Sequence, residues 1–163
     1  MFTEKQLKAI GCLVIESTHL EQYMEALIRT YTGETVSGLL LHRKMMDAKT
    51  DILKSLIINE TKDDKLKKKL GRLFSNIKTD IVSRNTVVHG DWGLAREMPL
   101  EEMIRQKRRG TAAAFRNNPK SPVKAKDIMN LAHRFADHQM KLLDLWDEFA
   151  ASAASLAPSP DKS

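Results

Sequence analysis

The sequence predicts an all-α protein, because of its composition and the spacing of its apolar residues. Seven glycines, five prolines and 6% aromatic residues in 163 leave few of the residues that favour turns and strands. Four long stretches repeat apolar residues every three or four positions, which places those residues on one side of a helix. We expect an antiparallel bundle of four to five helices forming one domain over residues 1–155, with a disordered tail at 156–163.

Charge and cysteine content indicate where the chain resides and what it binds. Lys and Arg outnumber Asp and Glu by 27 to 21, a net charge of +6 and a mild bias toward anionic partners. The single cysteine, Cys12, cannot form an internal disulfide, which fits a reducing cytoplasm. The chain starts without a basic and then apolar leader, and no apolar run approaches about 18 residues. We therefore expect a cytoplasmic protein with no membrane partner.

The first helix is expected over about residues 4–31. Thr3 followed by Gln6 resembles a capping box, in which each residue bonds the backbone N–H of the other. The apolar side of this helix comprises Leu7, Ile10, Leu13, Val14, Leu20, Met24, Leu27, Ile28 and Tyr31, with Ser17 among them. Gly33 follows the helix and ends it.

Four more helices are expected after the first, and one of them, described in the next paragraph, carries the candidate site. A short helix ends near Leu41, and a longer one spans about residues 43–59. The last helix spans about residues 124–154 and includes His138 within its apolar arc. A single histidine in such an arc is usually a buried core residue. The core of the last helix comprises Ile128, Leu131, Phe135, Leu142, Trp146, Phe149 and Ala153.

The helix over about residues 64–89 carries the candidate site. Its apolar stripe comprises Leu66, Leu70, Leu73, Phe74, Ile77, Ile81 and Val88. At about 100° per residue, Arg84 falls inside this stripe, where an arginine is costly unless it is paired or faces a wet cleft. Asn85 and His89 lie near the edge of the stripe, and Gly90 ends the helix. The structural alternative makes Arg84 an ion-pair partner and His89 a helix cap.

An acidic residue on the first helix is the expected partner of Arg84. Glu21 projects into the apolar arc of that helix, near Val14 and Ile28. A buried carboxylate needs a cation, and Arg84 is the inward-facing arginine of the motif helix. In the alternative, Glu21 reaches past the stripe into solvent.

The segment Arg84-Asn85-x-x-x-His89 resembles the signature of the HEPN superfamily, in which an Arg, a polar residue and a His lie on one helix. Four residues separate Arg84 from His89, within the range of that family, and Gly90-x-Trp92 is similar to the continuation in some members. The resemblance covers about the first ninety residues and the last helix. It implies a HEPN-like helical fold and matches Glu21 to an acidic residue that the family places near its motif.

The residues allow acid–base chemistry without a metal. The chain has no metal-ligand cluster, Gly-rich phosphate loop or other expected cofactor site. Imidazole titrates at about pH 6.5, so His89 can exchange a proton with a ribose hydroxyl or a leaving oxygen. Arg84 can hold the phosphate, and Asn85 can orient the histidine or donate to a phosphate oxygen. The resemblance implies RNA cleavage by 2′-hydroxyl attack in a homodimer, with Arg84 and His89 of both copies at one groove.

A basic insert at about residues 100–122 is the expected nucleic-acid arm. Between residues 103 and 126 the chain has eight Lys or Arg and no acid. A small β-hairpin over 102–108 and 112–116 is predicted around Gly110. The expected phosphate contacts are Arg105, Lys107, Arg108, Arg109 and Arg116. Trp92 is expected to shield the motif, and the alternative for the insert is a mobile charged loop.

Three functions follow from these observations. The first is a metal-independent endoribonuclease of the HEPN toxin or defence type, with an antitoxin or other protein as a possible partner. The second is a non-catalytic HEPN-like module that binds a nucleotide, RNA or protein. The third is a helical assembly protein whose basic arm contacts nucleic acid. Mutation of His89 separates the first from the others.

Overall fold

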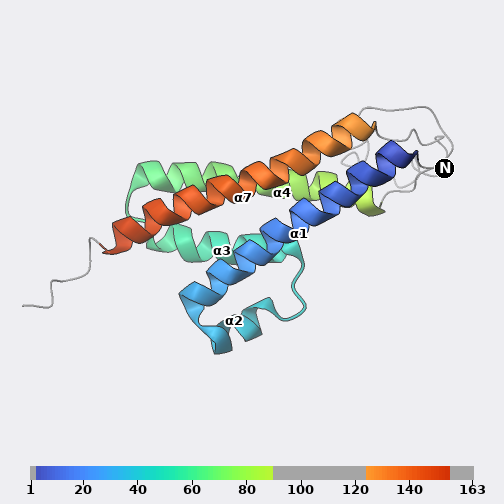
Figure 1. The fold of residues 1–163 in the computed structure, drawn as a ribbon. Helices are drawn as coiled ribbons and strands as arrows, with labels where there is room; N and C mark the ends of the chain where they lie inside the picture. Colours follow the sequence, from blue (N-terminus) through green and yellow to red (C-terminus); the bar gives the residue numbers. More distant parts are fainter. Residues whose placement is uncertain (1–2, 90–123, 155–163) are drawn as a thin grey trace, which may run out of the picture. The chain divides into compact units, whose positions relative to one another are not determined.

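The computed structural model describes residues 3–89 and 124–154, and each element in these ranges is a helix. The helices are α1 (Glu4–Thr32), α2 (Glu34–Leu41), α3 (Met46–Glu60), α4 (Asp64–His89) and α7 (Ala125–Ala154) (Figure 1). The all-α prediction is thus confirmed for the described residues. None of the helices in this part of the chain is long and apolar enough to cross a membrane. The expected hairpin and the tail at 156–163 lie outside the described residues.

The described helices divide into two compact units. The first unit contains α1 up to Leu20, α4 from Lys78 and α7 up to Asp137. The second unit contains the rest of these helices together with α2 and α3. Each unit has its own buried residues, and the single domain expected over residues 1–155 stays a prediction.

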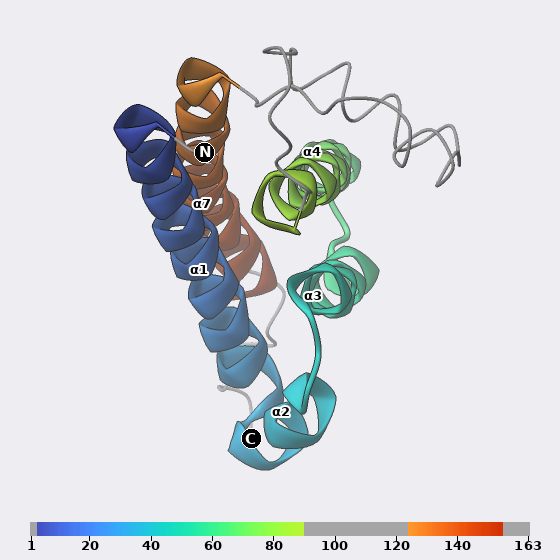
Figure 2. The same ribbon diagram turned by 90° about the vertical axis from the view of Figure 1, so that its right-hand side faces the viewer.

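The first unit packs one segment each of α1, α4 and α7. The segments of α1 and α7 lie side by side and run in the same direction (Figures 1 and 2). The buried apolar residues are Ala9, Leu13, Leu20, Ile81, Val87, Ile128, Leu131, Ala132 and Phe135. Leu7 and Val14 were expected among them but are 55% and 36% exposed. The packed face of α1 is narrower than the apolar stripe and is centred on Ala9 and Leu13.

The start of α1 has the expected capping box. The Thr3 backbone N–H donates to Gln6 Oε1 at 2.9 Å, and the Gln6 N–H donates to Thr3 Oγ1 at 3.2 Å. Two donors that have no partner within the helix are satisfied in this way. The Gln6 side chain is buried against the unit as a result.

The second unit contains the second part of α1, which passes into α2 at Gly33. Gly33 has a φ of 78°, and its N–H donates to the Arg29 carbonyl at 2.8 Å, which ends α1. Just before Gly33, the Tyr31 ring of α1 lies against the Phe149 ring of α7, with the ring centroids 6.2 Å apart. Tyr31 is partly exposed where it was expected to be buried. The buried apolar residues of this unit are Met24, Leu27, Ile28, Leu41, Met46, Leu53, Ile57, Leu66, Leu70, Leu73, Phe74, Ile77, Leu142 and Phe149.

The α4 helix follows the predicted pattern closely. Asp63 Oδ1 accepts from the Lys65 N–H at 2.7 Å and caps its start. The apolar stripe is buried from Leu66 to Ile81, as predicted. At the end of the helix Val87 is buried in place of the expected Val88. The packed face therefore turns in the last turns of α4, where the candidate site lies.

Candidate functional site

The last two turns of α4 hold the three motif residues. Arg84 and Asn85 are half-buried, and His89 is the exposed final residue of the helix. Arg84 Nη1 donates to Asn85 Oδ1 at 3.1 Å, so the structure brings these two side chains into contact. His89 follows Asn85 by four residues and is on nearly the same side of the helix. Residues 84–89 form the yellow-green end of α4 (Figure 1).

The Arg84 guanidinium has a buried donor. Its Nε is inaccessible to solvent and has no hydrogen-bond partner in residues 3–89 and 124–154. A buried donor without a partner costs about 1 to 3 kcal/mol, so such groups are uncommon and call for an explanation. An acceptor brought by a ligand, such as a phosphate oxygen, would satisfy this N–H.

The packed face around Arg84 is polar. Asp80, Ser83 and Thr86 are all buried. Ser83 Oγ donates to the Thr79 carbonyl at 3.1 Å, and Thr86 Oγ1 donates to the Val82 carbonyl at 2.9 Å. Both hydroxyls therefore bond the backbone of their own helix, which allows their burial. The end of α4 differs in this way from the apolar stripe that precedes it.

A second guanidinium is anchored next to this face. Arg134 of α7 binds the Asp80 carboxylate in a bidentate arrangement. Its Nε donates to Oδ1 at 3.1 Å and to Oδ2 at 3.0 Å, and its Nη2 donates to Oδ1 at 3.0 Å. The Asp80 side chain is 8% exposed and that of Arg134 is 46% exposed. Asp80 precedes Arg84 by four residues, so both lie on one side of α4. The Arg134 Nη1 atom takes no part in the hydrogen bonds to Asp80.

Asp80 and Arg134 were not expected from the sequence, although a signal for each was present. In projection Asp80 falls at the edge of the stripe beside Leu73, which makes it a second charged residue near Arg84. Arg134 lies at the edge of the α7 arc beside His138. Two opposite charges at the edges of two packed stripes would have suggested the pair.

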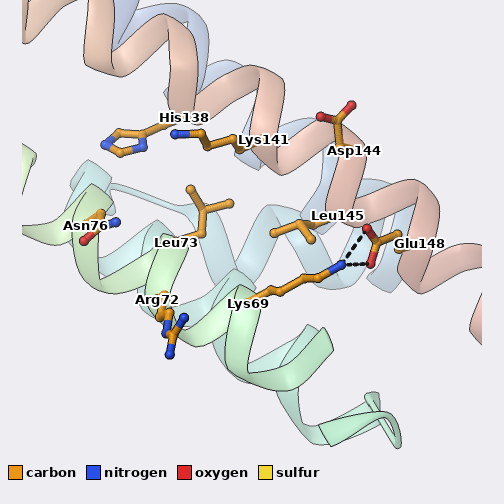
Figure 3. A pocket seen from close by; sticks show the side chains of 9 residues that line it. All are labelled: Lys69, Arg72, Leu73, Asn76, His138, Lys141, Asp144, Leu145 and Glu148. Atoms are coloured by element: carbon orange, nitrogen blue, oxygen red, sulfur yellow. Dashed lines mark hydrogen bonds and ion pairs between the residues drawn. The ribbon is translucent and has the colours of Figure 1, made fainter. Parts of the chain in front are cut away.

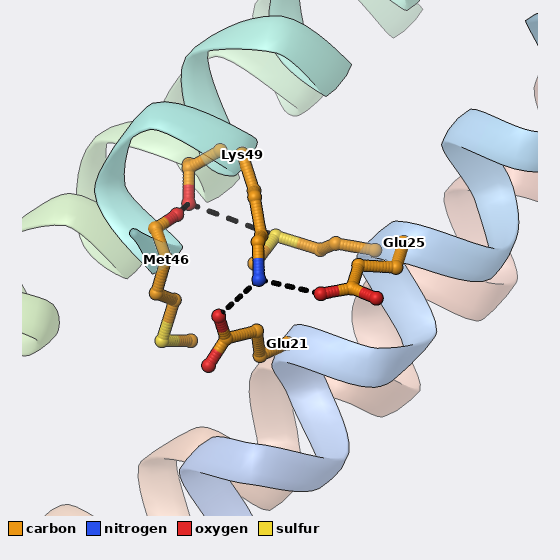
Figure 4. Close-up of polar contacts among 6 residues, drawn as sticks. Glu21, Glu25, Met46 and Lys49 are labelled. Carbon is orange, nitrogen blue, oxygen red and sulfur yellow. Dashed lines mark hydrogen bonds and ion pairs between the residues drawn. The ribbon is translucent and has the colours of Figure 1, made fainter. Parts of the chain in front are cut away.

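Glu21 has a different partner from the one expected. Lys49 Nζ of α3 lies 2.5 Å from Oε1 of Glu21 and 2.5 Å from Oε1 of Glu25 (Figure 4). Among the described residues the cation bound to Glu21 is Lys49, where the sequence favoured Arg84. In projection Lys49 falls between Leu53 and Leu56 on the packed side of α3, so the same reasoning that selected Glu21 would have found it.

The two carboxylates determine the ionisation of Lys49. Burial disfavours the charged ammonium and by itself lowers the pKa of Lys49. The hydrogen bonds and the negative charges of Glu21 and Glu25 act in the opposite direction and outweigh burial. The pKa of Lys49 is therefore raised above its ordinary value, and the lysine is a structural cation.

Six of the expected site residues lie outside the described residues. They are Trp92, Arg105, Lys107, Arg108, Arg109 and Arg116. Their roles at the motif and in the basic insert stay predictions.

The chemistry that the described residues offer is proton exchange and anion binding. Within residues 3–89 and 124–154, no three His, Cys, Asp or Glu side chains are grouped so that they could hold a metal ion. The end of α4 instead offers the His89 imidazole, the Asn85 amide and the Arg84 guanidinium, and α7 adds the Arg134 guanidinium. No protein family, curated protein or solved structure matches the chain significantly.

Proposed function

We propose that this protein is a metal-independent endoribonuclease of the HEPN type. The observation that carries the proposal is the polar end of α4. There a half-buried Arg84 has an Nε donor without a partner in the described part of the chain, and the exposed His89 lies on the same helix. A guanidinium that binds a phosphate and an imidazole that exchanges a proton are the groups that this cleavage needs.

The proposed reaction is internal transfer at an RNA phosphate. An imidazole takes the proton of a ribose 2′-hydroxyl, and the 2′-oxygen forms a bond to the adjacent phosphorus. The bond from phosphorus to the 5′-oxygen breaks, and a second imidazole gives that oxygen a proton. The products are a 2′,3′-cyclic phosphate and a 5′-hydroxyl. Arg84 stabilises the charge on the phosphoryl oxygens during the transfer.

The reaction needs an acid and a base, and the motif provides one histidine per chain. We therefore propose that the enzyme acts as a homodimer in which the two copies of His89 face one groove. One copy accepts the proton of the 2′-hydroxyl while the other protonates the leaving oxygen. Loss of activity upon dilution to monomer would follow from this arrangement.

Arg134 is proposed as a second phosphate-binding residue of this site. Asp80 fixes the guanidinium through Nε and Nη2, and these bonds do not use Nη1. An anchored guanidinium loses less side-chain entropy when it binds an anion than a mobile one does. The buried Asp80 is then a positioning residue.

The second candidate function is a non-catalytic module that binds a nucleotide, RNA or a protein. The contact of Arg84 with Asn85 and that of Arg134 with Asp80 favour it, because both build an anion-binding surface without using His89. For such a module, Arg84→Ala weakens RNA binding and His89→Ala leaves RNA binding unchanged. Neither the wild-type protein nor these variants cleave RNA.

The deciding experiment is RNA cleavage in EDTA by the wild-type protein, His89→Ala and His133→Ala. His133 is an exposed histidine on α7. His133→Ala, purified in the same way, is therefore a matched control for the loss of an exposed imidazole. We expect His89→Ala to lower the cleavage rate by at least about 100-fold, the usual contribution of a general acid or base. His133→Ala should retain full activity, and both variants should unfold at the wild-type temperature. Equal cleavage by all three proteins would refute the proposed role of His89.

A further inference from the structure

A groove in the second unit is lined by none of the motif residues. It has a volume of about 360 Å³ and lies between the first half of α4 and the second half of α7 (Figure 3). Leu73 of α4 and Leu145 of α7 supply its apolar surface. A volume of about 300 to 1,000 Å³ is typical of small-molecule sites. The groove is therefore large enough for a small molecule.

An ion pair bounds one end of the groove. Lys69 reaches from α4 to Glu148 of α7, and its Nζ donates to the two carboxylate oxygens at 3.0 and 2.8 Å (Figure 3). This pair joins the two helices and uses one cation and one acid of the lining.

The remaining charges of the lining favour an anion. Arg72 and Lys141 form no ion pair with any residue in the described ranges, and Asp144 is the remaining acid. Figure 3 shows the Lys141 side chain extending toward His138, whereas the Asp144 carboxylate points away from α4. The exposed lysines at positions 65, 67 and 68 of α4 add positive charge near this end of the helix.

We propose that this groove binds a small phosphomonoester with an apolar or aromatic body. Lys141 Nζ and the Asn76 amide are the donors for the phosphoryl oxygens, and Arg72 adds positive charge at the rim. The apolar body lies on Leu73 and Leu145. This site goes beyond the proposed nuclease and does not depend on Arg84 or His89.

The test is calorimetric titration of the full chain with phenyl phosphate, inorganic phosphate, phenol and a polyribonucleotide. Wild type, Lys141→Gln and Lys68→Gln are compared, since Lys68 is an exposed lysine of α4 outside the lining. We expect phenyl phosphate to bind more tightly than inorganic phosphate, and phenol not to bind. Lys141→Gln should weaken phenyl phosphate binding about tenfold, the loss of one charge-assisted bond. Lys68→Gln should stay within about twofold, because it changes only the distant field.

Three results would overturn the proposal. The first is no binding of phenyl phosphate by the wild-type protein. The second is an equal loss in Lys68→Gln and Lys141→Gln, which would show a general basic surface. The third is binding of polyribonucleotide alone, which would assign the surface to RNA. His89→Ala should bind phenyl phosphate like the wild type, so failure of the nuclease and failure of this site are distinguishable.

Discussion

Replacement of Lys49 by methionine tests the buried cluster in the second unit. The Lys49 side chain is 11% exposed, and those of Glu21 and Glu25 are each 28% exposed. Lys49→Met removes two charge-assisted hydrogen bonds, which contribute about 1.5 to 3 kcal/mol each when they are fully buried. The two carboxylates then face each other without a cation, but they keep partial access to water. We therefore expect the free energy of unfolding to fall by about 2 to 3 kcal/mol.

The assay is urea denaturation at pH 7 followed by circular dichroism, with thermal unfolding as a second measure. For a chain of this length the expected loss lowers the unfolding temperature by about 4 to 12 °C. The control is the triple variant Lys49→Met, Glu21→Gln, Glu25→Gln, which removes all three charges. It should recover much of the loss, because the carboxylates no longer repel each other. A Lys49→Met protein within about 0.5 kcal/mol of the wild type would refute this reasoning.

Three further predictions follow from other contacts. Because the pKa of Lys49 is raised in the folded state, its contribution to stability is fully present below pH 10.5 and is lost as the pH rises through the folded-state pKa. The difference in the free energy of unfolding between the wild type and Lys49→Met should therefore narrow above pH 10.5. A difference that widens above this pH would contradict a raised pKa for Lys49. Arg134→Met removes the guanidinium that binds the buried Asp80 carboxylate, and it should lower the free energy of unfolding by about 2 to 4 kcal/mol in urea denaturation. Asp80→Asn releases a half-exposed arginine and should lower the free energy of unfolding less. A larger loss in Asp80→Asn than in Arg134→Met would contradict this assignment. Gly33→Ala should lower the free energy of unfolding by about 1 kcal/mol, because Gly33 has a φ of 78°, which alanine rarely adopts. Gly38→Ala inside α2 should raise the free energy of unfolding slightly, and no atom lies within 4 Å of an added Cβ at either glycine. Equal effects of the two substitutions would show that φ at Gly33 does not matter.

Helix positions could be predicted from the sequence because local signals determine them. The α4 helix shows this well, since its apolar stripe from Leu66 to Ile81 is both regular and buried. The capping box at Thr3 and the glycine at position 33 also act within a few residues. These are short-range effects that spacing and residue type specify.

The partners of buried charges could not be predicted in the same way. A helical projection shows that Glu21 faces inward, but it does not show which cation of another helix lies opposite. Lys49 and Arg84 were both available, and the packing of α3 against α1 selects Lys49. Asp80 lies at the edge of its stripe, so its pairing with Arg134 depends on the approach of α7. Side-chain pairing across helices needs the tertiary arrangement.

The chemical nature of the RNA ends shows whether cleavage starts with attack by the 2′-hydroxyl. The wild-type protein is incubated in EDTA with an RNA oligonucleotide and with the same oligonucleotide carrying one 2′-deoxy nucleotide at the cleaved position. We expect a 2′,3′-cyclic phosphate on the upstream product of the RNA and no cleavage at the 2′-deoxy position. Cleavage at the 2′-deoxy position, or a product that ends in a 3′-hydroxyl, would contradict 2′-hydroxyl attack at the end of α4.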